Sequence, residues 1–236
     1  MNLKKYIPNF LTLLNLFCGC IALVFVADLN FEFAFFFVAL GIFFDFFDGF
    51  FARKFNVAGP LGVQLDSLAD MVTSGVVPGF LVFCLLSFHN TSGLKFVPYL
   101  GFVITLGACY RLAKFNIDTR QSETFIGLPT PANTLFFMSL PLINYDQLHF
   151  LTCSAAVYSG ILVFLCVVSA YVMNAEIPLF SLKIKNFSFT KYKLQIAFVL
   201  FAILFIGFFK YLGVALTIVL YVILSVFNNL FFSKKQ

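Results

Sequence analysis

The sequence has little charge and few residues of the kinds that perform polar chemistry. Only 11% of the 236 residues are charged, ten are acidic, two are histidine and none is tryptophan. By contrast, 61% are hydrophobic, 37 are phenylalanine, and the mean hydropathy is +1.00. No soluble domain needs so much apolar surface. The composition therefore excludes a soluble protein and predicts an all-α polytopic membrane protein.

The scarce histidines and cysteines are not arranged for catalysis or metal binding. His89 and His149 fall on the outer side of the expected spans, away from the main acidic stretch. The six cysteines lie in or at the edges of apolar runs, and Cys18 and Cys20 face different sides of a helix. We expect them to be packing residues. The basic residues do not cluster as in a nucleic-acid-binding domain, so no nucleic-acid partner is expected.

The apolar runs predict about eight transmembrane helices. The fifth run is short, and the last two are separated only by Lys210 and Tyr211. No stretch of the sequence repeats another. The expected spans are 9–27, 31–53, 63–88, 95–114, 130–145, 152–174, 193–209 and 211–232.

The basic residues predict the orientation of these spans. With both termini in the cytoplasm, only Lys95 and Lys210 lie outside. The other thirteen are cytoplasmic: Lys4, Lys5, Arg53, Lys54, Arg111, Lys114, Arg120, Lys183, Lys185, Lys191, Lys193, Lys234 and Lys235.

Two terminal segments allow more than one interpretation. The N-terminus resembles a signal peptide, but the polar residues within its apolar run favour a retained first span. The lysine-rich segment 181–195 either lies on the anionic inner leaflet or is an ordinary positive-inside loop.

Four of the ten acidic residues fall between residues 45 and 70. Asp45 and Asp48 are three apart, and Asp66 and Asp70 are four apart, so each pair lies on one face of a helix. The link at 56–60, Asn-Val-Ala-Gly-Pro, has the composition of a turn. A helical hairpin would therefore bring the two carboxylate pairs to the same depth, facing each other, as in a two-metal site.

Other interpretations of the aspartates are open. One is that they are interfacial residues that bind nothing, although an aspartate in mid-bilayer costs roughly 2.5–3.5 kcal/mol. An ion-coupled transporter also keeps carboxylates in its spans, but usually shows related halves, which this sequence lacks.

Polar residues elsewhere in the spans add candidates. Asn9, Thr12 and Asn15 fall near one helical face and either bind a ligand or make ordinary contacts between helices. Arg111 lies one turn inside the fourth span, where it either anchors the helix or binds an anionic group.

These residues resemble a known family. The pattern Asp45-x2-Asp48-Gly49-x2-Ala52-Arg53-x8-Gly62-x3-Asp66-x3-Asp70 resembles the signature of the CDP-alcohol phosphatidyltransferases, with all eight fixed positions present. The opening Ile7-Pro8-Asn9-x-Leu11-Thr12-x2-Asn15 is also similar to that family. Arg111-Leu-Ala-Lys-Phe-Asn116, followed by Gly127-Leu-Pro-Thr-Pro-Ala132, resembles its phosphatidylserine synthase branch, although Lys114 stands where arginine is expected.

The resemblance implies a six-helix core at 1–175, a basic cytoplasmic loop at 176–192 and a C-terminal transmembrane hairpin and tail at 193–236. It implies a homodimer in a bacterial-type inner membrane, with the active site on the cytoplasmic face. It also implies transfer of the phosphatidyl group of CDP-diacylglycerol to L-serine. The alternatives are a sister transferase acting on glycerol 3-phosphate or inositol phosphate and, remotely, an ion-coupled transporter.

The resemblance also assigns roles to residues. Asp45, Asp48, Asp66 and Asp70 would bind two divalent ions, Mg²⁺ or Mn²⁺ rather than Ca²⁺, and Asp70 is the catalytic base candidate. The candidates for serine or phosphate binding are Arg111, Lys114 and Asn116. The expected CDP-diacylglycerol contacts are Asn9, Thr12, Asn15, Gly49, Ala52, Arg53 and Gly62.

Overall fold

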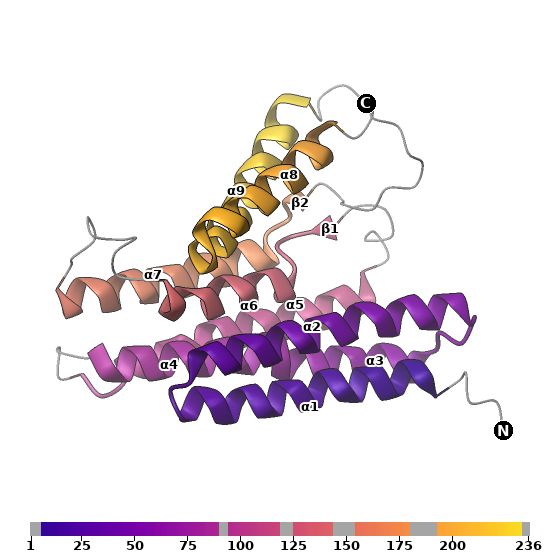
Figure 1. The fold of residues 1–236 in the computed structure, drawn as a ribbon, viewed down its shortest axis with the longest axis horizontal. Coiled ribbons are helices and arrows are strands. Elements are labelled where there is room, and N and C mark those ends of the chain that lie inside the picture. Colours follow the sequence, from indigo (N-terminus) through magenta and orange to yellow (C-terminus); the bar gives the residue numbers. More distant parts are fainter. Residues whose placement is uncertain (1–5, 90–93, 119–124, 144–153, 180–192, 233–236) are drawn as a thin grey trace.

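A computed structural model describes residues 6–89, 94–118, 125–143, 154–179 and 193–232. The segments expected to hold Lys4 and Lys5, Arg120, and the lysines at 183–191 and 234–235 therefore lie outside the described residues. The described chain is almost entirely helical (Figure 1). The helices are α1 (Ile7–Ala27), α2 (Phe31–Lys54), α3 (Pro60–Asp70), α4 (Val77–His89), α5 (Val103–Ile117), α6 (Thr130–Ser139), α7 (Ala155–Asn174), α8 (Lys193–Phe209) and α9 (Tyr211–Phe232).

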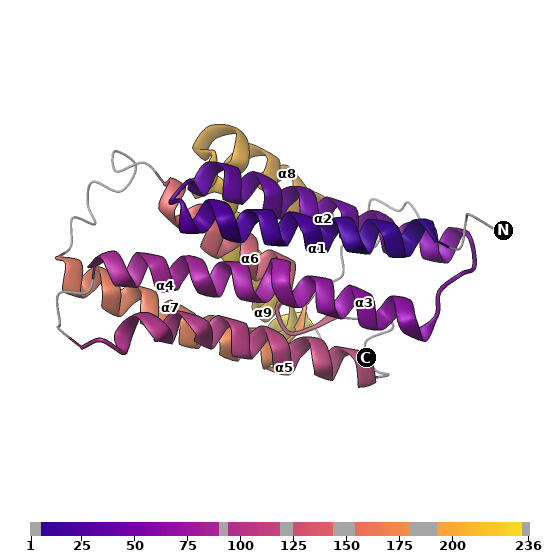
Figure 2. The ribbon, with the colours of Figure 1, turned by 90° about the horizontal axis from the view of Figure 1, so that it is seen from below.

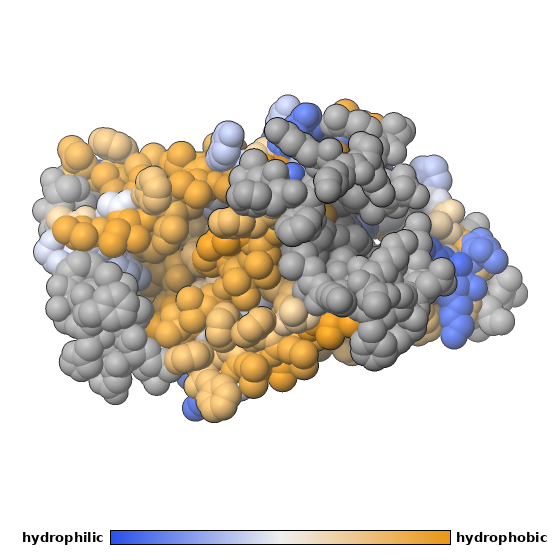
Figure 3. Space-filling view, turned by 90° about the horizontal axis from the view of Figure 1, so that it is seen from above, coloured by the Kyte–Doolittle hydropathy of each residue, from blue (hydrophilic) through white to orange (hydrophobic). Residues whose placement is uncertain are grey.

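The prediction of an all-helical, multi-pass membrane protein is confirmed. Within the described ranges, five stretches are long and apolar enough to cross a membrane. They are 7–27, 31–54, 60–89, 97–117 and 155–174. Helix α6 with the 3-10 turn η5 (Leu140–Leu142) is shorter, and α8 and α9 form an apolar pair. Figure 3 shows a face whose middle is covered largely by hydrophobic residues, with hydrophilic residues at the end that carries the α2–α3 connection.

Local sequence explains where the first helices begin and end. Pro8 and Pro60 stand in the first turns of α1 and α3, where a missing N–H costs nothing. The α1–α2 and α2–α3 connections use the left-handed residues Leu29 (φ 59°) and Asn56 (φ 54°). Asn30 caps α2 by accepting a hydrogen bond from the Phe33 amide. These turns place both α2 and α3 alongside α1 (Figures 1 and 2).

The third span contains a π-helical segment, η2 (Met71–Val76), directly after Asp70. Pro78 has no N–H, so the carbonyl of Ser74 lacks its usual helical donor. The hydroxyl of Thr134 on α6 donates to that carbonyl at 2.8 Å, and Thr105 on α5 donates to the carbonyl of Gly75 at 2.9 Å. Side chains of two other helices therefore satisfy the irregular backbone and fix η2 against α5 and α6.

A two-stranded antiparallel sheet joins the connection before α6 to the connection after α7. The sequence did not predict this sheet. Strand β1 (Phe125–Ile126) pairs with β2 (Pro178–Leu179), with Phe125 opposite Leu179. After β1, Gly127 adopts φ +75°, and a side chain there would collide with the carbonyl of Met173. Helix α9 packs against α6 and β2, which attaches the C-terminal hairpin to this part of the bundle.

Candidate active site

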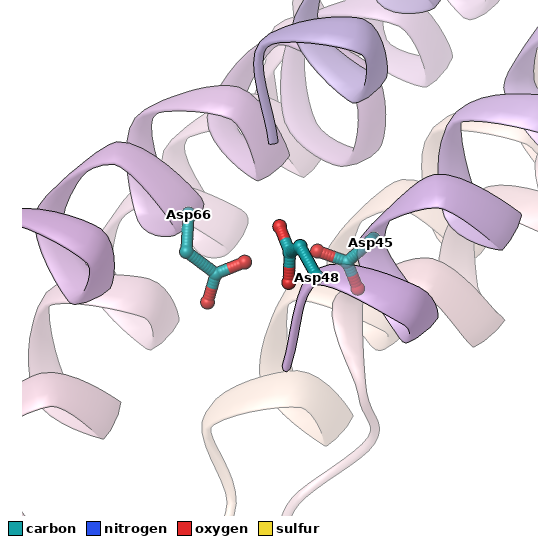
Figure 4. A group of neighbouring side chains, drawn as sticks. All are labelled: Asp45, Asp48 and Asp66. Atoms are coloured by element: carbon teal, nitrogen blue, oxygen red, sulfur yellow. The ribbon is translucent and has the colours of Figure 1, made fainter. Parts of the chain in front are cut away.

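Three carboxylates from two helices converge at the end of the bundle near the α2–α3 connection. Asp45 and Asp48 lie one turn apart on α2, and Asp66 lies on α3. One carboxylate oxygen from each lies within 4.8 Å of the others. The side chains point toward one another across the space between the helices (Figure 4). The i, i+3 spacing on α2 and the turn at 56–60 produce this arrangement.

The carboxylate cluster of Asp45, Asp48 and Asp66 fits a divalent cation. Two negative charges 4.8 Å apart repel by about 3 kcal/mol at an effective dielectric constant near 20. One oxygen of Asp45 is also buried without a hydrogen-bond donor among the described residues. Hard carboxylate oxygens are the ligands that Mg²⁺, Mn²⁺ and Ca²⁺ take in proteins. A bound divalent cation would offset the repulsion and satisfy the unpartnered oxygen.

Asp70 lies one turn beyond Asp66 and outside this cluster. Its side chain is 8% exposed, so it is nearly as buried as that of Asp48. One oxygen accepts a hydrogen bond from the side-chain amide of Asn15 at 3.1 Å. The four aspartates therefore divide into a cluster of three and one carboxylate held separately by α1.

A cleft of about 200 Å³ opens beside Asp48 and Asp66. Its lining includes six of the seven residues expected to contact CDP-diacylglycerol: Asn9, Thr12, Gly49, Ala52, Arg53 and Gly62. Asn15, the seventh, is fully buried and does not line the cleft. The structure thus brings the predicted binding residues together, with this one exception.

Glycines keep the cleft open. A β-carbon at Gly49 would lie 3.3 Å from the guanidinium of Arg53, so that side chain lies close over the helix backbone. A β-carbon at Gly62 would lie 3.5 Å from the side-chain oxygen of Asn9. Side chains at these two positions would project into the space between α1, α2 and α3. The glycines allow a ligand to approach the backbone closely.

Helix α1 also holds one member of the carboxylate cluster. The hydroxyl of Thr12 donates to Asp48 and lies 3.1 Å from the carbonyl of Pro8. A hydroxyl has a single proton, and an ionised carboxylate is the stronger acceptor. Thr12 therefore orients the Asp48 carboxylate as well as lining the cleft.

Arg111 is buried among backbone groups and does not line the cleft. Its side chain is 7% exposed, and one guanidinium nitrogen, Nη1, donates to the carbonyls of Ile126 and Met173, both at 2.8 Å. It therefore links α5 to the strand β1 and to the end of α7. The role of Arg111 in binding serine or phosphate stays a prediction.

Lys114 and Asn116 also have protein partners away from the cleft. The ammonium of Lys114 lies 3.6 Å from a carboxylate oxygen of Glu176. Asn116 donates to the hydroxyl of Ser67 at 2.8 Å, next to Asp66 in the chain. The sequence offered no signal for Glu176 or Ser67, because these contacts join segments about 50 to 60 residues apart.

Comparisons with known proteins agree on one family. The family model for CDP-alcohol phosphatidyltransferase matches residues 5–172. The chain is similar to the CDP-diacylglycerol–serine O-phosphatidyltransferase of Bacillus subtilis, at 39% identity over 131 residues, or 54% of this chain and 70% of that protein.

Two more distant relatives carry the same name. The Helicobacter pylori (strain J99) protein is 33% identical over 146 residues, covering 61% of this chain and 60% of its own. The Saccharomyces cerevisiae protein is 33% identical over 153 residues, covering 57% of this chain and 53% of its own. The chain thus spans just over half to about two thirds of the length of these relatives.

Proposed function

Because this chain belongs to the CDP-alcohol phosphatidyltransferase family, we propose that it transfers the phosphatidyl group of CDP-diacylglycerol to L-serine. The products are phosphatidylserine and CMP. The observation that carries the proposal is the convergence of Asp45, Asp48 and Asp66 beside a cleft lined by the glycines and the arginine of the eight-residue signature.

The charge of the cleft favours serine over the phosphorylated acceptors of sister enzymes. Glycerol 3-phosphate and inositol phosphate each carry a phosphate dianion, which calls for several cationic side chains. Among the described residues that line the cleft, Arg53 is the one cation. That single cation suits one phosphate of the nucleotide-linked donor, and the described lining residues offer no second cation for an acceptor phosphate.

The reaction is a substitution at the phosphorus that carries the diacylglycerol. The serine hydroxyl oxygen forms a bond to this phosphorus, the phosphorus–oxygen bond to CMP breaks, and CMP leaves with that electron pair. The hydroxyl proton passes to a base, for which Asp70 is the candidate. Thr12 holds the Asp48 carboxylate, and Arg53 lies at the cleft where it can pair with a phosphate of the donor.

A divalent metal fits the carboxylate cluster, and we propose Mg²⁺ or Mn²⁺, with two ions per site; Asp70 is either a ligand of the second ion or the base that takes the serine proton. Bound metal would stabilise negative charge that develops on the phosphate oxygens. We further propose that the cleft faces the cytoplasm of a bacterial-type cell, where soluble serine is available, and that the protein is a homodimer. Arg53 and Lys54 at the same end of the bundle support this orientation.

CMP release by the purified protein in CDP-diacylglycerol micelles tests the proposal. Serine, glycerol 3-phosphate and inositol phosphate are offered separately with Mn²⁺ or Mg²⁺, and Asp70→Asn is the control. Release that requires serine and metal, and is lost in Asp70→Asn, is the expected result. Release with another acceptor would move the activity to a sister enzyme, and no release with any acceptor from folded protein would overturn the proposal.

A further inference from the structure

Asn15 occupies an unusual position among the polar residues of α1. Thr12 and Asn9 line the cleft, whereas Asn15 is fully buried and contacts the one aspartate that is separate from the carboxylate cluster. Only the NH₂ group of an asparagine can donate to a carboxylate, so this contact sets which way the amide faces. The amide nitrogen points at Asp70 and the amide oxygen points away from it.

The amide oxygen of Asn15 has no hydrogen-bond donor among the described residues, although it is buried. It lies against Gly41 on α2, where an added β-carbon would be 2.9 Å away. An unpaired buried amide oxygen costs about 1–3 kcal/mol. The amide of Asn15 keeps this orientation because a flipped amide would place its oxygen next to the carboxylate of Asp70, where neither oxygen could donate a hydrogen bond. Gly41 provides the room that this orientation needs.

The backbone of Asn15 is held from the other side by η2. The hydroxyl of Thr73 donates to the Asn15 carbonyl at 3.1 Å. Thr73 packs closely on Gly19, one turn further along α1. The segment that follows Asp70 is therefore fixed to the same turn of α1 that holds the Asp70 side chain. Two hydrogen bonds therefore set the position of Asp70 relative to α1: Thr73 donates to the backbone carbonyl of Asn15, and the side-chain amide of Asn15 donates to Asp70.

We infer that Asn15 is a positioning residue for Asp70 and not a contact of the nucleotide. Its amide holds one oxygen of Asp70 and leaves the other free to accept the proton of the acceptor hydroxyl. This inference rests on the proposed function for the reaction, but the contact itself does not depend on that function. Partners that orient a functional carboxylate typically change activity about 10–100-fold when they are removed.

Exchanging Asn15 and Asp70 tests the hydrogen bond between them independently of the reaction. Asn15→Asp keeps the side-chain shape but replaces the donor with a second negative charge facing Asp70, so Tm is expected to fall. In the double variant N15D/D70N, the new amide at position 70 can donate to the new carboxylate at position 15. We expect the Tm of the double variant to lie above that of Asn15→Asp, while its activity is abolished because the base is gone.

Steady-state kinetics test the positioning role. For Asn15→Asp we expect kcat to fall about 10–100-fold, with KM for CDP-diacylglycerol changed less than about threefold. Gly41 does not line the cleft, and the three atoms nearest to an added β-carbon there belong to Asn15, Thr73 and Cys18, so Gly41→Ala is expected to lower kcat in the same way by displacing Asn15. Asn174→Asp is the matched control, since Asn174 also donates from a helix, to the carbonyls of Gly107 and Ala170. It is expected to keep the kcat of the unmodified protein.

These measurements distinguish a positioning role of Asn15 from a direct contact with the nucleotide. A raised KM for CDP-diacylglycerol with unchanged kcat would make Asn15 a nucleotide contact and overturn the inference. A double variant no more stable than Asn15→Asp would show that the contact with Asp70 does not exist. If the unmodified protein released no CMP, the proposed function would fail, and the Tm comparison would still decide whether Asn15 holds Asp70.

Discussion

Replacing Thr12 with valine tests whether α1 orients the carboxylate cluster. Valine has nearly the shape of threonine, so the packing of this buried side chain, 3% exposed, is retained. The hydrogen bond to Asp48 is lost. A hydrogen bond to a charged group contributes about 1.5–3 kcal/mol. Since about 1.4 kcal/mol corresponds to a factor of ten, the Mn²⁺ concentration for half-maximal activity should rise roughly 10–100-fold.

The assay is CMP release as a function of Mn²⁺ concentration, with serine and CDP-diacylglycerol saturating. Thr217→Val is the matched control, because the one acceptor of the Thr217 hydroxyl among the described residues is the carbonyl of Gly213 in the same helix, α9. Thr12→Ser, which keeps the hydroxyl, should stay close to the unmodified protein. If Thr12→Val and Thr217→Val had the same Mn²⁺ dependence, Thr12 would not orient a metal ligand and the reasoning would be refuted.

Two other substitutions probe the cluster and the backbone around Arg111. Asp66→Asn removes one of three mutually repelling charges, so in EDTA its Tm should equal or exceed that of the unmodified protein, while the rise in Tm on adding Mn²⁺ disappears. An undiminished Mn²⁺ effect would contradict a metal site there. Gly127→Ala forces a β-carbon onto the Met173 carbonyl at φ +75° and should destabilise the protein by at least about 1 kcal/mol, measured as a lower Tm. Gly160→Ala, with open space around it, is the control, and equal stability of the two variants would refute the argument.

The helical spans were predictable because the bilayer imposes a simple rule on sequence. A crossing helix needs about 20 apolar residues, and backbone polar groups must be satisfied within it. The expected runs therefore coincide within a few residues with α1, α2, the stretch 60–89 that ends with α4, the stretch 97–117 that ends with α5, and α7. The short fifth run is also short in the structure, where α6 ends after Ser139.

Local irregularities were not predictable to the same degree. Pro78 indicates an irregular helix, but the sequence around it does not predict whether the helix bends or becomes π-helical. The choice depends on whether other helices offer donors for the free carbonyls, as Thr134 and Thr105 do. The pairing of β1 with β2 likewise joins residues more than 50 positions apart, and neither strand has a signal of its own.

The sequence by itself brought together three of the four predicted aspartates, Asp45, Asp48 and Asp66, and six of the seven residues expected at the cleft; it also grouped Asp70 with them, which the structure holds outside the cluster. Helical periodicity places Asp45 with Asp48, and the turn at 56–60 folds Asp66 back toward them, so local geometry is enough. Only the tertiary structure decided the partners of single polar side chains: Asn15 with Asp70 instead of the cleft, and Arg111 with the carbonyls of Ile126 and Met173. A hydrogen bond forms over about 3 Å, a precision that the packing of whole helices sets and that sequence spacing along one helix does not contain.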